Sequence, residues 1–311
     1  LDIRGLLKCG QVSNRIRAIS NDESLWLKLN FYEGNIPYEL VEKAAENGCK
    51  YLSVAKAFLY YAIPTVPCKP LNFKYLEMSN LDCNNSSDKE LLENCSSLEK
   101  LSLDMATGDV DTIENIGKNG QTLKVLNFGT YIVGNPIKAI KKLFKSCVGL
   151  NELNVRELFS SQQEKLVTAM VKNLTPNIRK VDLGSDLKDE HVNLLVERCN
   201  RITELKLAFT SINKDSLESI ATHLNSCLEK LDVSHTKIDS TALLQLRSIG
   251  TLKVLICLNF EDDNAKNFEG LKSLRKNLPQ VSINEEGFYI AKSTKNEKRL
   301  EYENGFWARN I

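Results

Sequence analysis

The sequence predicts an α/β protein in which short strands and helices alternate along one curved solenoid. Two observations predict it. One apolar pattern recurs at a nearly constant interval over most of the 311 residues. Stretches with the 3.6-residue spacing of amphipathic helices lie between most copies of that pattern. A chain built in this way buries its apolar side chains between neighbouring repeats, so it reaches this length without a second core.

The recurring pattern has the form L-x-x-L-x-L, and its clearest copy is Leu228–Val233. Successive central residues are 24 to 28 positions apart. A period of this size with this pattern is the signature of a leucine-rich repeat. Strands lie about 4.8 Å apart whereas helices need about 10 Å each, so the strands should line the inside of a curve. The central residues are Leu52, Leu76, Leu101, Leu126, Leu153, Val181, Leu205, Leu231, Leu255 and Val281.

Composition is that of an ordinary folded protein, with 42% hydrophobic residues and a net charge of +1. The near-neutral charge gives no support for nucleic acid or a membrane surface as a partner. No apolar run approaches the roughly 20 residues that span a bilayer. Three of the nine cysteines, Cys95, Cys147 and Cys199, each precede the first apolar residue of a repeat by three positions. This regularity predicts buried free thiols rather than disulfides, and hence a cytoplasmic or nuclear protein.

Residues 1–31 do not fit the repeat and are predicted to form a small helical unit. Apolar residues from Ile3 to Ile19 have the spacing of two short helices. Asp22 and Glu23 are suited to the start of a further helical turn that contains Leu25 and Trp26. The chain opens on Leu1 in the middle of this pattern, and we expect the sequence to be a fragment. One interpretation of this unit is a helical cap on the repeats.

Residues 32–283 are predicted to form a solenoid of about ten repeats. A first helix is expected over 39–46. Three prolines between 64 and 70 exclude a continuous helix there, so that repeat should be extended. The later helices should begin near residues that favour helix starts. These residues are Ser86, Pro136, Ser160, Asp189, Asn213, Asp239 and Asp262.

Residues 284–311 are predicted to form a C-terminal tail with aromatic residues, including Phe306 and Trp307. The chain from Ile283 to Phe306 could reach roughly 75 Å when extended. This exceeds the roughly 43 Å expected for the inner arc of strands. We therefore predict that Phe306 and Trp307 dock on the concave face. The alternative is a local cap on the last repeat.

No pattern in the sequence indicates catalysis. A phosphate-binding loop, an H-E-x-x-H motif and paired C-x-x-C motifs are all missing from it. We expect no catalytic residue, no cofactor and no metal. The side chains next to the central residues should face the concavity and bind a protein partner, with a solvated sheet surface as the alternative. The predicted binding residues are Tyr75, Glu77, Lys100, Asp104, Asn127, Asn154, Arg156, Asp182, Lys206, Asp232 and His235.

The N-terminal unit resembles the later part of an F-box. The matching residues are Leu6, Leu7, Val12, Ser13, Arg15, Arg17 and the segment from Asp22 to Trp26. The opening helix of that family would lie before residue 1, and Ile16 replaces its usual aromatic residue. An F-box followed by leucine-rich repeats resembles the substrate receptors of SCF ubiquitin ligases, and the tail favours the S-phase kinase-associated type.

The resemblance implies a non-catalytic receptor that holds a protein substrate, phosphorylated or not, for ubiquitination and degradation. It also implies an SCF adaptor subunit as partner, which connects the receptor to a cullin. The alternative is a repeat scaffold or inhibitor that binds a protein without a ligase. The residues expected to contact the adaptor are Leu6, Leu7, Val12, Ile16, Leu25 and Trp26.

Overall fold

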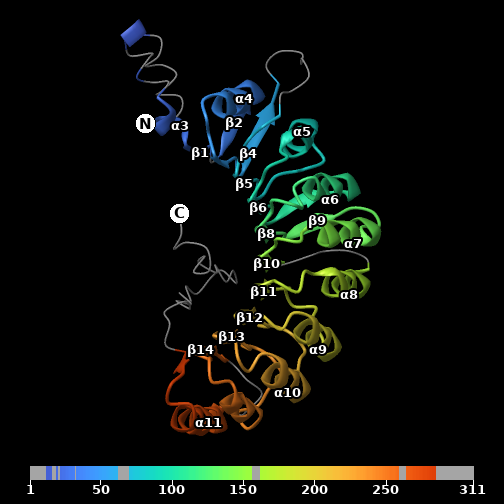
Figure 1. Ribbon diagram of the computed structural model, residues 1–311, viewed down its shortest axis with the longest axis vertical. Coiled ribbons are helices and arrows are strands. Elements are labelled where there is room, and N and C mark those ends of the chain that lie inside the picture. Colours follow the sequence, from blue (N-terminus) through green and yellow to red (C-terminus); the bar gives the residue numbers. More distant parts are fainter. Residues whose placement is uncertain are drawn as a thin grey trace.

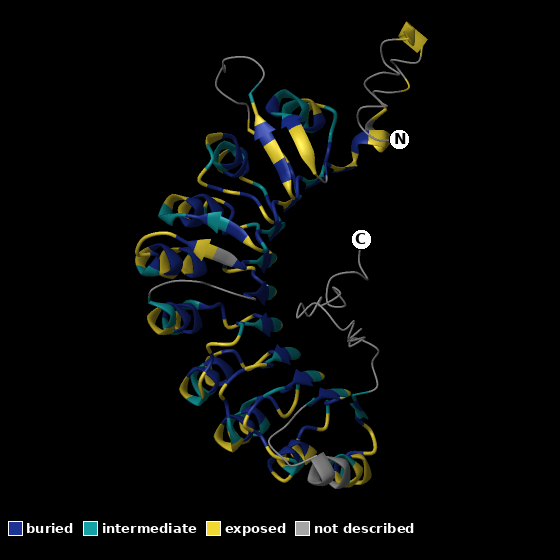
Figure 2. Ribbon diagram, turned by 180° about the vertical axis from the view of Figure 1, so that it is seen from behind, coloured by how far each residue is buried: buried dark blue, intermediate teal, exposed yellow. Residues whose placement is uncertain are grey.

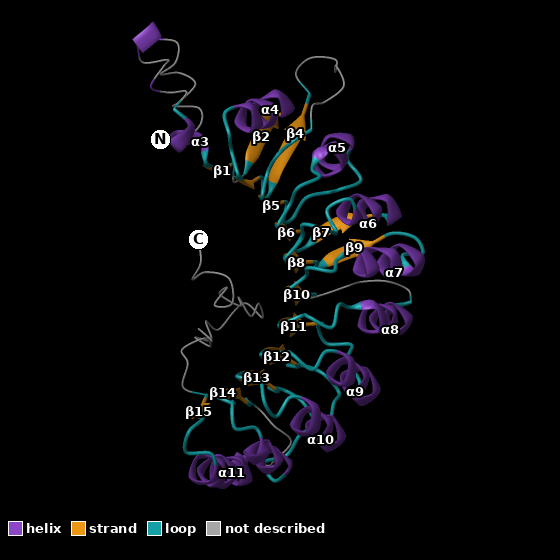
Figure 3. Cartoon of the chain, viewed as in Figure 1, coloured by secondary structure: helices purple, strands orange, loops and turns teal. Residues whose placement is uncertain are grey.

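The computed structural model describes residues 12–15, 19, 22–31, 33–61, 70–155, 162–258 and 264–284. Within these ranges the chain forms a curved solenoid (Figure 1), with strands along its inner side and helices along its outer side (Figure 3). The predicted leucine-rich-repeat solenoid is confirmed. Helices are wider than the spacing between strands, so this arrangement forces the curvature.

An eleven-stranded parallel sheet lines the concave side. Its strands pair in one register, in which Leu101 lies opposite Leu126 and Leu126 opposite Leu153. Each repeat thus places its central residue at the same level. In order the strands are β1 (Lys28–Asn30), β3 (Tyr51–Ser53), β5 (Tyr75–Glu77), β6 (Lys100–Ser102), β8 (Val125–Asn127), β10 (Glu152–Asn154), β11 (Lys180–Asp182), β12 (Glu204–Lys206), β13 (Lys230–Asp232), β14 (Val254–Ile256) and β15 (Ser282–Ile283).

Two further pairs of parallel strands follow the main sheet in the first repeats. They join β2 (Gly34–Pro37) to β4 (Ala57–Tyr60), and β7 (Ala106–Gly108) to β9 (Thr130–Ile132). The extended segment predicted around the three prolines lies almost entirely in residues 62–69, outside the described residues, so that prediction stays a prediction.

The helices form the convex side, and neighbouring helices pack side by side. Asp109 starts one of them by accepting a 2.9 Å hydrogen bond from the Thr112 N–H, which satisfies a donor that the first turn leaves open. None of the described helices is long and apolar enough to cross a membrane. The helices are α3 (Glu23–Trp26), α4 (Tyr38–Glu46), α5 (Ser86–Asn94), α6 (Val110–Gly117), α7 (Ile137–Ser146), α8 (Gln163–Asn173), α9 (Asp189–Arg198), α10 (Lys214–His223), the 3-10 helix η1 (Ala242–Ser248) and α11 (Asn264–Asn277).

One continuous apolar core runs between the sheet and the helices (Figure 2). Cys95, Cys147 and Cys199 are fully buried in it as free thiols, as the sequence predicted. Burial raises the pKa of the Cys95 thiol to about 12. The Cys199 Sγ donates a 3.6 Å hydrogen bond to the carbonyl oxygen of Thr175, which belongs to the preceding repeat. These thiols therefore act as small core residues.

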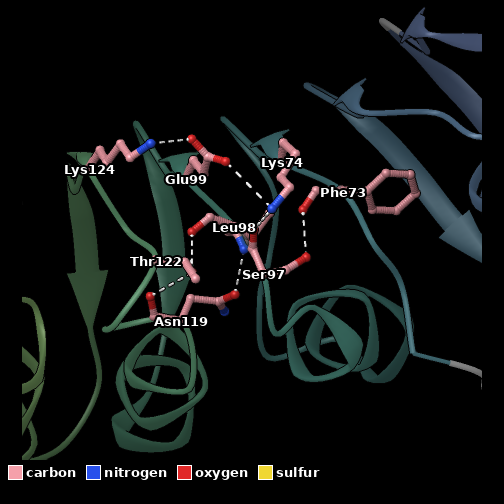
Figure 4. Close-up of polar contacts among 8 residues, drawn as sticks. All are labelled: Phe73, Lys74, Ser97, Leu98, Glu99, Asn119, Thr122 and Lys124. Atoms are coloured by element: carbon pink, nitrogen blue, oxygen red, sulfur yellow. Dashed lines mark hydrogen bonds and ion pairs between the residues drawn. The ribbon is translucent and has the colours of Figure 1, made fainter. Parts of the chain in front are cut away.

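Buried side chains also connect consecutive repeats (Figure 4). The Asn119 Oδ1 accepts the Leu98 N–H at 2.8 Å, and its Nδ2 donates to the Cys95 carbonyl oxygen at 2.9 Å. The Thr122 hydroxyl donates to the Leu98 carbonyl oxygen at 2.7 Å. These bonds satisfy backbone groups that the strand ladder leaves open.

The structure corrects the sequence analysis at both ends of the sheet. The residue opposite Leu255 is Ile283, not Val281 as predicted. Both side chains are buried, and two apolar residues two positions apart point to the same face, so the pattern alone could not separate them. At the other end, β1 pairs with β3 through Leu29 and Leu52. The sheet thus begins at Lys28, inside the range assigned to the partial F-box.

Candidate functional site

Three rows of side chains cover the concave face. The upstream row holds the first residue of each main-sheet strand, and the downstream row holds the third. Both rows point away from the buried central residues. The rim row holds the residue immediately before each strand. Backbone bonds continue the ladder through it, as in the 2.9 Å bond from the Lys74 N–H to the Lys50 carbonyl oxygen.

Oppositely charged side chains alternate across β10 to β13. In the upstream row, Lys180 Nζ lies 3.5 Å from a Glu152 carboxylate oxygen and 3.0 Å from one of Glu204. In the downstream row, Lys206 Nζ lies 3.1 Å from Asp182 Oδ2. Burial lowers the pKa of Lys180, but its bonds to Glu204 and Glu152 outweigh that effect and raise the pKa. The positive and negative side chains of this part of the face therefore pair with one another.

Two stacked tyrosines stand in the upstream row near the other end. The rings of Tyr51 and Tyr75 have centroids 4.3 Å apart and planes within 5° of parallel. Both side chains are half-buried. Desolvation, followed by the proximity of Tyr51 and Glu99, raises the pKa of Tyr75. The pair is a preorganised aromatic surface in a mostly polar face.

The rim row near these tyrosines carries three charges in a line (Figure 4). Glu99 lies between two lysines, 2.7 Å from Lys124 Nζ and 3.5 Å from Lys74 Nζ. One carboxylate thus serves two ammonium groups, so the group keeps a net positive charge.

The predicted binding residues are not equally accessible. Asp232 is only 4% exposed and accepts the Ser234 N–H at 3.0 Å, so its role is to hold the turn after β13. We correct its assignment as a binding residue for this reason. Asn154 is 9% exposed. Glu77 is exposed, and Lys100 is half-buried.

A line of residues with left-handed backbone follows the strands at the rim opposite the rim row. His235, with φ +56°, is one of these residues, and its ring stacks on Phe209, with φ +62°, at a centroid distance of 4.3 Å. Phe209 is 40% exposed. Asp104 also lies at this rim, where its Oδ1 covers the backbone of Gly129. His235 and Asp104 were predicted to lie on the concave face and lie at its edge, whereas Phe209 was not predicted from the sequence.

Tyr51 was missed as well, although the sequence carried a signal for it. Tyr51 precedes Leu52 just as Tyr75 precedes Leu76, so the repeat alignment alone puts the two rings in neighbouring strands. Arg156, Phe306 and Trp307 lie outside the described residues, and their predicted binding and docking roles stay predictions.

The residues predicted to contact the adaptor differ in how far they are exposed. Trp26 is 1% exposed and belongs to the solenoid core, so the structure corrects its assignment as an adaptor contact. It is the last residue of α3, and its indole packs in the core at the end of the solenoid where β1 lies. Leu25 is 39% exposed and Val12 is 70% exposed. Leu6, Leu7 and Ile16 lie outside the described residues.

Comparison with known proteins identifies one family. A model of the SKP2 LRR domain matches residues 40–311. Among solved structures, an internalin from Listeria monocytogenes str. 4b F2365 matches with a TM-score of 0.40 and 16% sequence identity. That match covers 70% of this chain and 55% of the internalin, so the chain spans little more than half of that protein's length.

Proposed function

This chain belongs to the family of the SKP2 LRR domain, and from this membership we propose that it is the substrate-recognition subunit of an SCF-type ubiquitin ligase. The observation that carries the proposal is the family match over 40–311, which includes nearly the whole solenoid. The resemblance of the N-terminal residues to an F-box supports it. The concave face would hold a target protein, and the N-terminal unit would hold the adaptor that connects to a cullin.

In this function the chain contributes position rather than bond chemistry. A receptor raises the effective concentration of a substrate lysine near a ubiquitin-charged enzyme. This requires a rigid connection between the part that binds substrate and the part that binds the adaptor. The burial of Trp26 in the core favours such a connection, because α3 then cannot swing freely relative to β1. We propose that the protein is not an enzyme and acts in the cytoplasm or nucleus.

The short helix α3 has features suited to an adaptor contact. Asp22 starts it by accepting the Ser24 N–H at 2.9 Å. Leu25 on this helix keeps 39% of its surface exposed, although the neighbouring Trp26 is buried. An exposed leucine beside a buried anchor can be covered by a partner without disturbing the core.

Co-purification with an SCF adaptor subunit tests the proposal. The full-length protein should retain the adaptor, and Leu6→Ala with Leu7→Ala should abolish retention. Leu25→Ala should weaken it, whereas Tyr131→Ala, at an exposed position on β9, serves as the matched control. Circular dichroism should show an intact solenoid in each variant. Failure of the full-length protein to retain any adaptor would favour a repeat scaffold without ligase function.

A further inference from the structure

The half of the concave face built on β1, β3, β5, β6 and β8 carries an excess of positive charge. In its three rows, five lysines stand against two glutamates. Asp104 lies beyond these rows at the opposite rim. The excess attracts a negatively charged ligand. The charged residues of these rows are Lys28, Lys50, Lys74, Lys100, Lys124, Glu77 and Glu99.

The half built on β10 to β14 has no such excess. The same three rows carry five basic and five acidic residues. Three ion pairs among them are described above. A fourth lies in the rim row, where Lys253 Nζ is 3.0 Å from a Glu229 carboxylate oxygen. A charged ligand here would have to replace pairs that already exist. The charged residues are Arg179, Lys180, Lys206, Lys230, Lys253, Glu152, Asp182, Glu204, Glu229 and Asp232.

The stacked tyrosines lie inside the basic half. The strand order places Tyr51 and Tyr75 between Lys28 and Lys100 in the upstream row. Rigid tyrosines contribute large contact area at low entropic cost and are frequent in binding hot spots. An apolar side chain of a ligand would fit on the rings while negative groups on either side meet the two lysines.

Lys100 is suited to meet one of those groups. Burial lowers the pKa of this ammonium group, and Glu152 and Glu77 only partly offset the effect. A partly desolvated ammonium gains more from an approaching carboxylate than a fully hydrated one does. Lys28 is exposed at the other side of the aromatic pair.

Two amide oxygens at the border between the two halves lack a donor. The Oδ1 atoms of Asn127 and Asn154 are buried without any hydrogen bond, and the two residues are partners in neighbouring strands. Both oxygens are shielded from the surface of the face, so they are not counted among the contacts of a ligand. The span from Lys28 to Lys100 is three strand spacings, about 14 Å, which an extended peptide covers with about four residues.

We propose that the β1–β8 half of the concave face, defined by Lys28, Tyr51, Tyr75 and Lys100, binds an extended acidic segment of a partner protein. An apolar residue of that segment packs on the tyrosines, and its carboxylates meet the lysines. A protein is favoured over nucleic acid because the whole chain carries a net charge of only +1. The inference rests on the proposed function only in taking this face as the one that holds a protein.

The test is fluorescence anisotropy of the full chain with a labelled synthetic peptide of about ten residues, long enough for this span, in which glutamates flank one phenylalanine. Lys100→Glu should weaken binding on the order of tenfold. Lys230→Glu places the same change in the upstream row of the balanced half, and it should change affinity by less than about twofold. Tyr75→Ser should weaken binding more than Tyr131→Ser, which alters an exposed tyrosine on β9. Melting curves show that each variant is folded.

Three results would overturn the inference. They are no binding of the acidic peptide to the unsubstituted chain, equal losses for Lys100→Glu and Lys230→Glu, and equal binding of a peptide with lysine in place of glutamate. Tighter binding of oligouridylate than of the acidic peptide would instead assign the surface to nucleic acid. Adaptor co-purification separates the two claims. Peptide binding without adaptor retention removes only the proposed ligase function, and adaptor retention without peptide binding removes only this inference.

Discussion

Replacing Asn119 with alanine should destabilise the solenoid strongly, although the side chain lies far from any expected ligand. Asn119 is 1% exposed, and its amide joins the turn after α6 to the preceding repeat through the Leu98 N–H and the Cys95 carbonyl oxygen. Alanine would leave both backbone groups buried and unpaired. Each such loss costs about 1–3 kcal/mol, so we expect a total of about 4 kcal/mol, with a smaller addition from the cavity.

Urea unfolding and amide hydrogen exchange together measure this effect. Solenoids can unfold in parts, so the midpoint alone would not locate the change. Exchange should speed up most at the Leu98 amide, which loses its acceptor. Asn84→Ala, at an exposed position, is the control and should stay within about 0.5 kcal/mol. A loss below about 1 kcal/mol for Asn119→Ala, with Leu98 still protected, would refute the view that this amide is a main connection between repeats.

Three further predictions concern buried groups. Burial, and to a lesser extent Asp82, raises the pKa of Asp88 from 3.8 to about 7, so native stability should fall as pH rises through this interval. At about pH 8 the unfolding free energy of Asp88→Asn should then exceed that of the unsubstituted chain by on the order of 4 kcal/mol, with no such gain at about pH 4. Trp26→Ala should cost about 3–5 kcal/mol in unfolding free energy, and an undiminished melting temperature would show that the indole does not close the core. Cys199 should react slowly with a thiol reagent until denaturant is added, and rapid labelling of the native protein would contradict its burial. Cys199→Ala should lower the unfolding free energy by on the order of 1 kcal/mol, and Cys199→Asp should lower it far more.

The pairing of charges decides which part of the concave face can attract a ligand. Both halves carry the same number of basic residues in the three rows. They differ because the balanced half carries as many acidic as basic residues, and Lys180, Lys206 and Lys253 each lie within ion-pair distance of an acidic side chain. Counting charges along the chain therefore says little about this surface, whereas the register between strands says which charges meet.

The period of the apolar residues was enough to determine the solenoid, because leucines at fixed spacing can be buried together only if the repeats stack. It also located Cys95, Cys147 and Cys199 in the core, since every repeat needs a small residue at the same point. Tertiary structure alone decided the ends of the array. Trp26 has the same local sequence signals whether it binds a partner or fills its own core, and only the position of β1 shows that it is buried. Likewise Val281 and Ile283 point to the same face of an extended strand. The hydrogen bonds to β14, rather than the side chains, decide which of the two lies opposite Leu255.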